Sequence, residues 1–177
     1  MDERLIEDEL AIVFERTAEK DGPVLDQRAL DEPTHRLSPT TPLAVSLGAP
    51  LADAISLMRE NRVGCVLIVD GGTLVGIITE RDLLMKLADT DLERPVDDLM
   101  TPDPETLHPD DPIAFALNLM SDGGFRHVPL VDVDHRPVGI VSVKHVVNYL
   151  ADFFPAAVLT VPPDLSRADM WRSRYGA

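Results

Sequence analysis

The sequence has a single cysteine, Cys65, and no hydrophobic run near the roughly 20 residues that a membrane-spanning helix needs. One cysteine excludes an internal disulfide and a zinc site built from cysteines. Its place in the apolar run VGCVLIVD predicts a small buried thiol. The N-terminus, MDERLIEDEL, is acidic where a secretory signal would be basic and then apolar. We therefore expect a soluble, cytoplasmic protein with no membrane partner.

Basic residues are scarce relative to acidic ones. The 16 Lys and Arg residues face 31 Asp and Glu residues, which gives a formal net charge of -15 at pH 7. This balance argues against nucleic acid as a partner, because such proteins neutralise a phosphate backbone over a broad basic surface. Small anions remain possible ligands where donors cluster locally. The 177 residues, 45% hydrophobic and 27% charged, are typical of a globular protein with one ordinary core or two small modules.

Two segments of the chain repeat one pattern. Aligning LADAISLMRENRVGCVLIVD with IAFALNLMSDGGFRHVPLVD sets Met58 opposite Met120 and Asp70 opposite Asp132, a constant offset of 62. Beyond the aspartate the offset becomes 63, because DGGTLVG is one residue shorter than DVDHRPVG, and turns tolerate such changes best. The pattern predicts two copies of one unit. The expected divisions are an N-terminal helix and linker, two repeats and a C-terminal tail, at residues 1–36, 37–94, 95–154 and 155–177.

Each copy is predicted to run strand, helix, strand, strand, helix, beginning with a short extended piece. In copy one, apolar residues at helical spacing follow Pro50, and Asn61 is expected to end that helix in a left-handed conformation. In copy two we expect Asp110 or Asp111 as the cap, Pro112 in the first turn, and Gly123 with Gly124 at the end.

A hairpin is predicted after the first helix of each copy. In copy one it joins the nearly continuous apolar run VGCVLIV to TLVGIIT through the turn DGG. The following run, ERDLLMKLA, places Leu83, Leu84 and Leu87 on one helical face.

The two ends of the chain are less informative. The N-terminal stretch DERLIEDELAIVFERTAEK places Ile6, Leu10, Val13 and Phe14 on one side of a charged helix, which would pack on the modules or on a second chain. The C-terminal stretch contains Trp171 among arginines, and is either a tail held by one aromatic anchor or a partly disordered end.

The paired units resemble the cystathionine-β-synthase (CBS) domain pair, also called a Bateman module. In that family each unit carries a glycine, two apolar residues, Thr or Ser, two variable residues and an aspartate; Gly76, Thr79 and Asp82 match this pattern. The resemblance covers about residues 37–154. It implies an α+β fold with two tandem β-α-β-β-α repeats packed about a pseudo-twofold axis. It also implies two clefts for adenosine-type ligands and dimerisation into a flat disc.

Copy two departs from the family pattern at one position. Gly139 and Ser142 match, but His145 stands where the aspartate would be. A histidine can hydrogen-bond a ribose or add positive charge near phosphate, but it is not a fixed acceptor at neutral pH. We therefore expect the second cleft to bind no ligand, to prefer a different ligand or to bind its ligand in a pH-dependent way. The plainer alternative is that His145 is a surface histidine at the start of a helix.

Two functions of Thr79 and Asp82 remain open from the residues alone. A helix that begins near Thr79 presents unpaired N–H groups to a phosphate, and the carboxylate of Asp82 offers acceptors to the 2'- and 3'-hydroxyls of a ribose. Alternatively, Thr-x-x-Asp forms a capping box that needs no ligand.

The strand that begins the hairpin differs in charge between the copies. Arg126 and His127 stand where copy one has Gly64 and Cys65, and basic side chains at this place need either solvent or an anion. In nucleotide-binding relatives of this family, basic residues here meet ligand phosphates. The small Gly64 and Cys65 would leave room for a base. By the same resemblance, the base would be held near Thr41 and Pro42, or Asp103 and Pro104, with Val63 or Phe125 alongside.

Catalysis is not predicted. The five histidines, His35, His108, His127, His135 and His145, include no helical zinc pair, and no nucleophile elbow or phosphate-cradling loop is present. No dedicated metal site is indicated, although Mg²⁺ could enter with a nucleotide. We expect a regulatory module that binds AMP, ADP, ATP or S-adenosylmethionine, forms a homodimer and signals to another protein. The alternative is a dimeric scaffold of the same fold that needs no ligand. If the module binds a nucleotide, Asp82 should mark the ribose end of one principal site.

Overall fold

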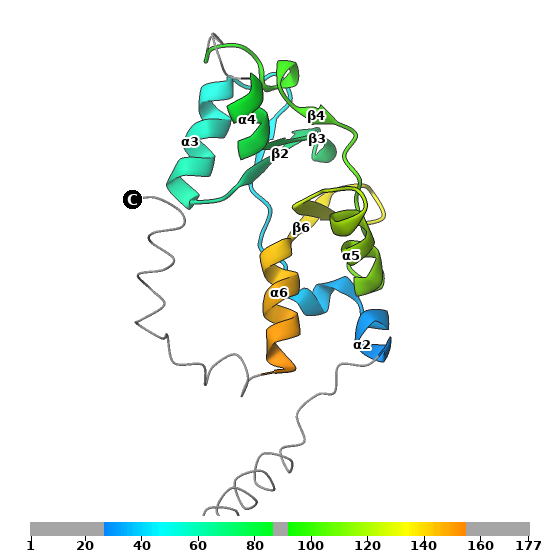
Figure 1. The fold of residues 1–177 in the computed structure, drawn as a ribbon. Coiled ribbons are helices and arrows are strands. Elements are labelled where there is room, and N and C mark those ends of the chain that lie inside the picture. The colour runs from blue at the N-terminus through cyan, green and yellow to red at the C-terminus, as the bar shows by residue number, and fades with distance from the viewer. Residues whose placement is uncertain (1–26, 87–91, 155–177) are drawn as a thin grey trace, which may run out of the picture. The chain divides into compact units, whose positions relative to one another are not determined.

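The computed structural model describes residues 27–86 and 92–154 (Figure 1). The described residues up to Leu150 belong to one compact unit. The amphipathic N-terminal stretch, Leu87 and Trp171 lie outside the described residues, so the predictions made for them stay predictions.

Helices and strands follow one another in the order that the repeat predicts. In chain order they are α2 (Gln27–Asp31), η1 (Thr34–Leu37), β1 (Ala44–Ser46), α3 (Leu51–Asn61), β2 (Cys65–Asp70), β3 (Thr73–Thr79), α4 (Glu80–Lys86), η2 (Val96–Asp98), β4 (Thr101–Pro102), α5 (Ile113–Ser121), β5 (His127–Val131), β6 (Pro137–Ser142) and α6 (Val143–Asp152). Figure 1 shows α3 and α4 beside the first sheet, and α5 and α6 beside β6. The predicted α+β class is confirmed.

The two hairpins share their irregularities as well as their pairing. β2 and β3 are antiparallel, as are β5 and β6, and the register shifts between Ile68 and Val69 in the first hairpin and between Leu130 and Val131 in the second. These positions are equivalent at the repeat offset. β1 runs parallel to β2, whereas in the second repeat this strand is reduced to a single parallel bridge between Leu107 and Leu130.

Each repeat is completed by the segment at the start of the other repeat. Leu37 of η1 lies in the core of the second repeat, with α5, β5, β6 and α6. Val96 and Leu99, around η2, lie in the core of the first repeat, with α3, β2 and β3. The backbone pairing repeats this exchange, because Pro33 bridges Pro112 and the equivalent Pro95 bridges Pro50.

A third buried cluster joins the two hairpins. It consists of Cys65, Leu67, Leu74, Ile77, Val131 and Ile140. The backbone N–H of Leu74 also donates to the carbonyl of His135, over 3.0 Å. Cys65 is buried as predicted, and burial, followed by the nearby charge of Glu80, raises the pKa of its thiol to about 12. The thiol is therefore neutral and unreactive at physiological pH.

Some predicted helix boundaries are wrong. The left-handed residue after α3 is Arg62 (φ 54°), not Asn61, whose side-chain amide donates to the carbonyl of Leu57. No side chain caps α5, because Asp111 instead accepts from the backbone N–H of His108. α5 ends at Ser121, and Gly123 and Gly124 follow its cap residue, with Gly124 in the left-handed conformation (φ 68°) that the prediction of a glycine end implies.

The start of α4 agrees with the predicted runs TLVGIIT and ERDLLMKLA, but its buried face differs from the prediction. Thr79 is the last residue of β3, and the helix begins at Glu80. Leu83 packs on the first core, but Leu84 is 84% exposed, so the two do not share a buried face.

The glycine of each family motif lies where the exchanged segment crosses the hairpin. Thr101 and Pro102 of β4 pair with Ile77 and Gly76 of β3, and a Cβ on Gly76 would overlap the sulfur of Met100. In the second repeat, a Cβ on Gly139 would come within 3.1 Å of Pro39. A close approach of two segments therefore explains a glycine here.

Replacing Gly76 should destabilise the fold through this contact. We expect Gly76→Ala to lower the free energy of unfolding by about 1–3 kcal/mol, as overpacking does in other cores. Chemical denaturation measures this value. In a Met100→Ala background the same substitution should cost markedly less, because the overlapping side chain is gone. An equal cost in both backgrounds would show that Met100 is not the obstacle.

Candidate functional site

Two clefts lie where the two repeats meet. The first encloses about 220 Å³ and is lined by the end of β3, the start of α4, the segment around β4 and the approach to β5. Its lining residues are Ile77, Thr79, Arg81, Asp82, Thr101, Pro104, Glu105, Gly123, Gly124, Phe125, Arg126 and His127. The second encloses about 430 Å³ and is lined by Thr40, Arg62, Val63, Gly64, Cys65, Glu80, Arg126, His127, Ile140, Ser142, Val143, Lys144 and His145. Arg126 and His127 line both.

Thr79 and Asp82 form a closed capping box at the mouth of the first cleft. Asp82 Oδ2 accepts from the Thr79 hydroxyl over 2.6 Å and from the Thr79 backbone N–H over 3.0 Å. The Asp82 N–H donates back to the hydroxyl oxygen over 3.4 Å. The N–H of Glu80 donates to the carbonyl of Gly64 over 3.0 Å. These N–H groups are therefore already satisfied, and a phosphate in this cleft must be met chiefly by side chains.

The Asp82 carboxylate is ionised and nearly saturated. Burial works to raise its pKa, but the hydrogen bonds from Thr79 and Lys86 and the charge of Lys86 lower it below its ordinary value. Lys86 donates to Asp82 Oδ1 over 3.1 Å and also to the carbonyl of Leu99 over 2.8 Å. Because each carboxylate oxygen has two acceptor positions, one position on Oδ1 remains for a ligand.

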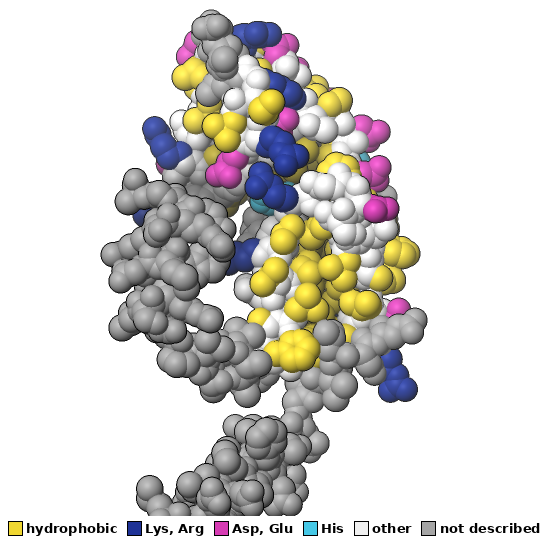
Figure 2. All heavy atoms as spheres, in the orientation of Figure 1, with side chains coloured by type: hydrophobic (Ala, Val, Ile, Leu, Met, Phe, Trp, Pro, Cys, Tyr) yellow, Lys and Arg dark blue, Asp and Glu magenta, His cyan; other side chains and the backbone are white. Residues whose placement is uncertain are grey.

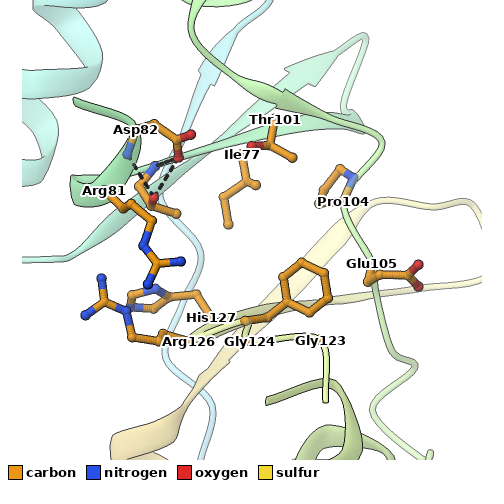
Figure 3. Close-up of a pocket in the computed structure, with 12 residues that line it drawn as sticks. Ile77, Arg81, Asp82, Thr101, Pro104, Glu105, Gly123, Gly124, Arg126 and His127 are labelled. Atoms are coloured by element: carbon orange, nitrogen blue, oxygen red, sulfur yellow. Dashed lines mark hydrogen bonds between the residues drawn. The ribbon is translucent and has the colours of Figure 1, made fainter. Parts of the chain in front are cut away.

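Two arginines extend toward the first cleft without a counter-charge of their own. Figure 3 shows Arg81 reaching from the start of α4 toward Arg126 and His127. Within residues 27–86 and 92–154, no carboxylate lies at ion-pairing distance from Arg81 or Arg126, whereas Arg36 and Arg94 each pair with an acid. Figure 2 shows basic side chains gathered in the middle of the face that it draws.

His127 forms a wall between the clefts. A Cβ on Gly64 would lie 3.1 Å from its ring and 3.5 Å from the Glu80 carboxylate, so a side chain here would force the ring to shift by a few tenths of an ångström. Burial and then the charge of Arg126 lower the pKa of His127, and although Glu80 opposes them the net shift is downward. At neutral pH the His127 ring is therefore uncharged.

Ser142 and His145 reproduce the capping box without an acid. The backbone N–H of Ser142 donates to His145 Nδ1 over 3.0 Å. Nδ1 must therefore be unprotonated, which leaves the ring proton on Nε2. Burial, and then Lys144, lower the pKa of His145 below 6.5. The second cleft thus presents a hydrogen-bond donor where the first presents an acceptor.

The structure gathers most of the predicted site residues, but in two groups. Thr79, Asp82, Pro104 and Phe125 line the first cleft, Val63, Gly64, Cys65, Ser142 and His145 line the second, and Arg126 and His127 line both. Thr41, Pro42 and Asp103 line neither. Sequence reasoning missed Arg81 and Lys144, which occupy a variable position of the motif. Their equivalence at the offset of 63 is the signal that could have found them.

Two parts of the chain match a protein-family model described as the CBS domain, at residues 36–89 and 96–152. These matches cover more than half of the sequence. The chain belongs to the CBS domain family. A 17.7 kDa protein of Acidianus ambivalens is 31% identical over 118 residues, which are 66% of this chain and 72% of the relative. Several longer CBS domain-containing proteins of Arabidopsis thaliana are 31–35% identical, and the chain spans only 17–22% of their length.

Solved CBS domain pairs have the same fold. The CBS domain pair of protein MJ0100, in complex with 5'-methylthioadenosine and S-adenosyl-L-methionine, is 27% identical with a TM-score of 0.60, over 67% of this chain and 98% of that one. The protein CBSX2 in complex with AMP is 27% identical with a TM-score of 0.59, over 68% and 96%. Within the described part of this CBS protein, no helix is both long and apolar enough to cross a membrane.

Protonation of His145 should destabilise the fold. Because its folded-state pKa lies below its unfolded value of about 6.5, the contribution is complete above that pH and is lost as pH falls through the folded pKa. Other charged and titratable groups that line the same cleft come from several elements. They include Lys144 of α6, Arg62 at the end of α3, Glu80 of α4, Arg126 just before β5, and His127, the first residue of β5.

The variant His145→Asn tests this, because its amide oxygen can accept from Ser142 and does not titrate. Free energies of unfolding from urea titrations between pH 7.5 and 5 should fall more steeply for the wild type than for the variant. Parallel pH profiles would contradict the assignment of Nδ1 as the acceptor.

Proposed function

We propose that this protein is a regulatory module that binds an adenine nucleotide or a related adenosyl compound in its first cleft and signals the bound state to another protein. The main support is the pair of arginines, Arg81 and Arg126, which extend toward one cleft without an acid partner among the described residues. Unpaired guanidinium groups beside a capping box favour an anionic ligand, because they match phosphate geometry and repel each other otherwise.

Each part of a nucleotide has a matching group in the first cleft. Phosphate would meet Arg81 and Arg126, and a ribose hydroxyl would donate to the remaining acceptor position on Asp82 Oδ1. Phe125, 39% exposed, and Pro104 offer apolar surface for the base. The second ribose hydroxyl would have to displace Lys86 or turn the Thr79 hydroxyl, since both positions on Oδ2 are filled.

Relatives narrow the ligand class. MJ0100 binds 5'-methylthioadenosine and S-adenosyl-L-methionine, and CBSX2 binds AMP. All three ligands contain adenosine, and among them the two arginines favour AMP because it alone carries a phosphate. The cleft of about 220 Å³ is smaller than the usual ligand pocket of about 300–1,000 Å³, so binding would move Arg81 or Phe125 or leave part of the ligand in solvent.

Lys86 offers a route from ligand to signal. It ties the Asp82 carboxylate on α4 to the carbonyl of Leu99 beyond η2. A ribose that competes for Asp82 would weaken this tie and free α4 to shift. The same helix exposes Leu84 (84%) and Met85 (77%), and we place the contact with a second copy or an effector protein there. Such a protein acts by binding and not by catalysis.

Melting the purified protein with AMP, ADP, ATP or S-adenosylmethionine, with and without Mg²⁺, tests the proposed function. At about 100 times Kd a ligand stabilises the native state by roughly 2.7 kcal/mol, which raises Tm by on the order of 5–11 °C. We expect this shift with AMP, and we expect Arg81→Ala to remove most of it while leaving the ligand-free Tm unchanged.

Matched variants separate ligand contact from capping. Asp82→Ala should lose the shift but also lower the ligand-free stability by about 0.5–2 kcal/mol, because it removes the cap. Lys144→Ala, the equivalent of Arg81→Ala in the second repeat, should keep the AMP shift. If no compound changes Tm, the proposal fails and the alternative of a scaffold that needs no ligand is favoured. The proposed site also fails if Arg81→Ala responds to AMP as the wild type does.

A further inference from the structure

The side chains that line the second cleft carry a net positive charge, and those that line the first do not. Three cations line it, Arg62, Arg126 and Lys144, against a single carboxylate, Glu80. The first cleft has two of each sign, with Arg81 and Arg126 against Asp82 and Glu105. In the described part of the chain, none of the three cations lies at ion-pairing distance from an acid. A local excess of positive charge in a chain of net charge -15 is a feature that calls for an anionic partner.

Hydrogen bonding at the capping position points the same way. His145 Nδ1 is filled by the Ser142 N–H, so its free edge is the donor Nε2–H. Phosphate oxygens accept hydrogen bonds and cannot donate them when ionised, so they match this edge, whereas at the equivalent position of the first cleft the Asp82 carboxylate would repel them. At the position equivalent to Asp82, the second cleft therefore has no fixed acceptor for a ribose hydroxyl.

The three cations come from separate parts of the chain, so they can contact one ligand from different sides. Arg62 ends α3 in a left-handed conformation, Lys144 lies in the first turn of α6, and Arg126 precedes β5. The cleft encloses about 430 Å³, roughly twice the first, and falls within the usual range for ligand pockets.

We propose that the second cleft is a separate site for a linear polyphosphate group, bound by Arg62, Arg126, Lys144 and the Nε2–H of His145 without a ribose contact. The group belongs either to a free inorganic polyphosphate or to the tail of a nucleoside triphosphate. Arg126 serves both clefts, so a polyphosphate in the second competes with AMP in the first for one guanidinium.

Isothermal titration calorimetry with inorganic tripolyphosphate tests the site directly. Wild-type protein should bind it, and Lys144→Ala and Arg62→Asn should each weaken binding about tenfold or more, the loss expected for one charge-assisted hydrogen bond. Asn suits the left-handed position of Arg62, so this variant removes the charge without straining the helix end. Affinity should also fall as salt is raised.

The matched control is Arg81→Ala, which should bind tripolyphosphate as the wild type does while losing AMP. Titration with ATP distinguishes the two sources: equal dependence of ATP and tripolyphosphate on Lys144 supports recognition of the shared tail. The proposal is overturned if tripolyphosphate gives no binding up to about 1 mM, if Lys144→Ala and Arg62→Asn bind it normally, or if ATP alone binds. Because Arg81→Ala reports on AMP and Lys144→Ala on tripolyphosphate, either site can fail without the other.

Discussion

The core of each repeat is closed by a segment from the start of the other repeat. Leu37 fills the second core, and Val96 and Leu99 fill the first. Burial of each such side chain stabilises the fold by about 1.5–3 kcal/mol, and all of this would be lost if the repeats separated. The exchange also brings the segments after η1 and η2 across the motif glycines, and these crossings form one wall of each cleft. Both candidate sites therefore depend on this reciprocal packing.

Asymmetry between the clefts arises from a few substitutions on this symmetric frame. Asp82 and His145 accept the same kind of backbone hydrogen bond, yet one leaves an acceptor and the other a donor facing the cleft. Gly64 and Arg126 are equivalent as well, and the missing side chain of Gly64 makes room for His127. Arg126 and His127 line both clefts, so under our proposals a ligand that binds Arg126 in one cleft competes with a ligand in the other. A regulatory protein can use such coupling to compare two ligands.

Local pattern predicted the repeat, the helix α3 and the boundaries of β3, because hydrophobic periodicity and turn residues act over short distances. The exchange of segments was not predicted, since it pairs residues far apart in sequence, such as Thr40 with Ile140. For the same reason one N–H group expected to be free at the helix start is occupied: the N–H of Glu80 donates to the carbonyl of Gly64, just before β2. Thr79 and Asp82 were found through the family motif. Arg81 and Lys144 were not, because the motif leaves their position variable.

In the function proposed for this protein, the two clefts differ in the ligand that they accept. Amide chemical shifts of the ¹⁵N-labelled protein, followed during separate titrations with AMP and with tripolyphosphate, measure this most directly. AMP should perturb the amides of Thr79, Arg81 and Thr101, and tripolyphosphate those of Arg62, Ser142 and Lys144, while Arg126 and His127 respond to both. Perturbation of one and the same set of amides by the two ligands would contradict the account.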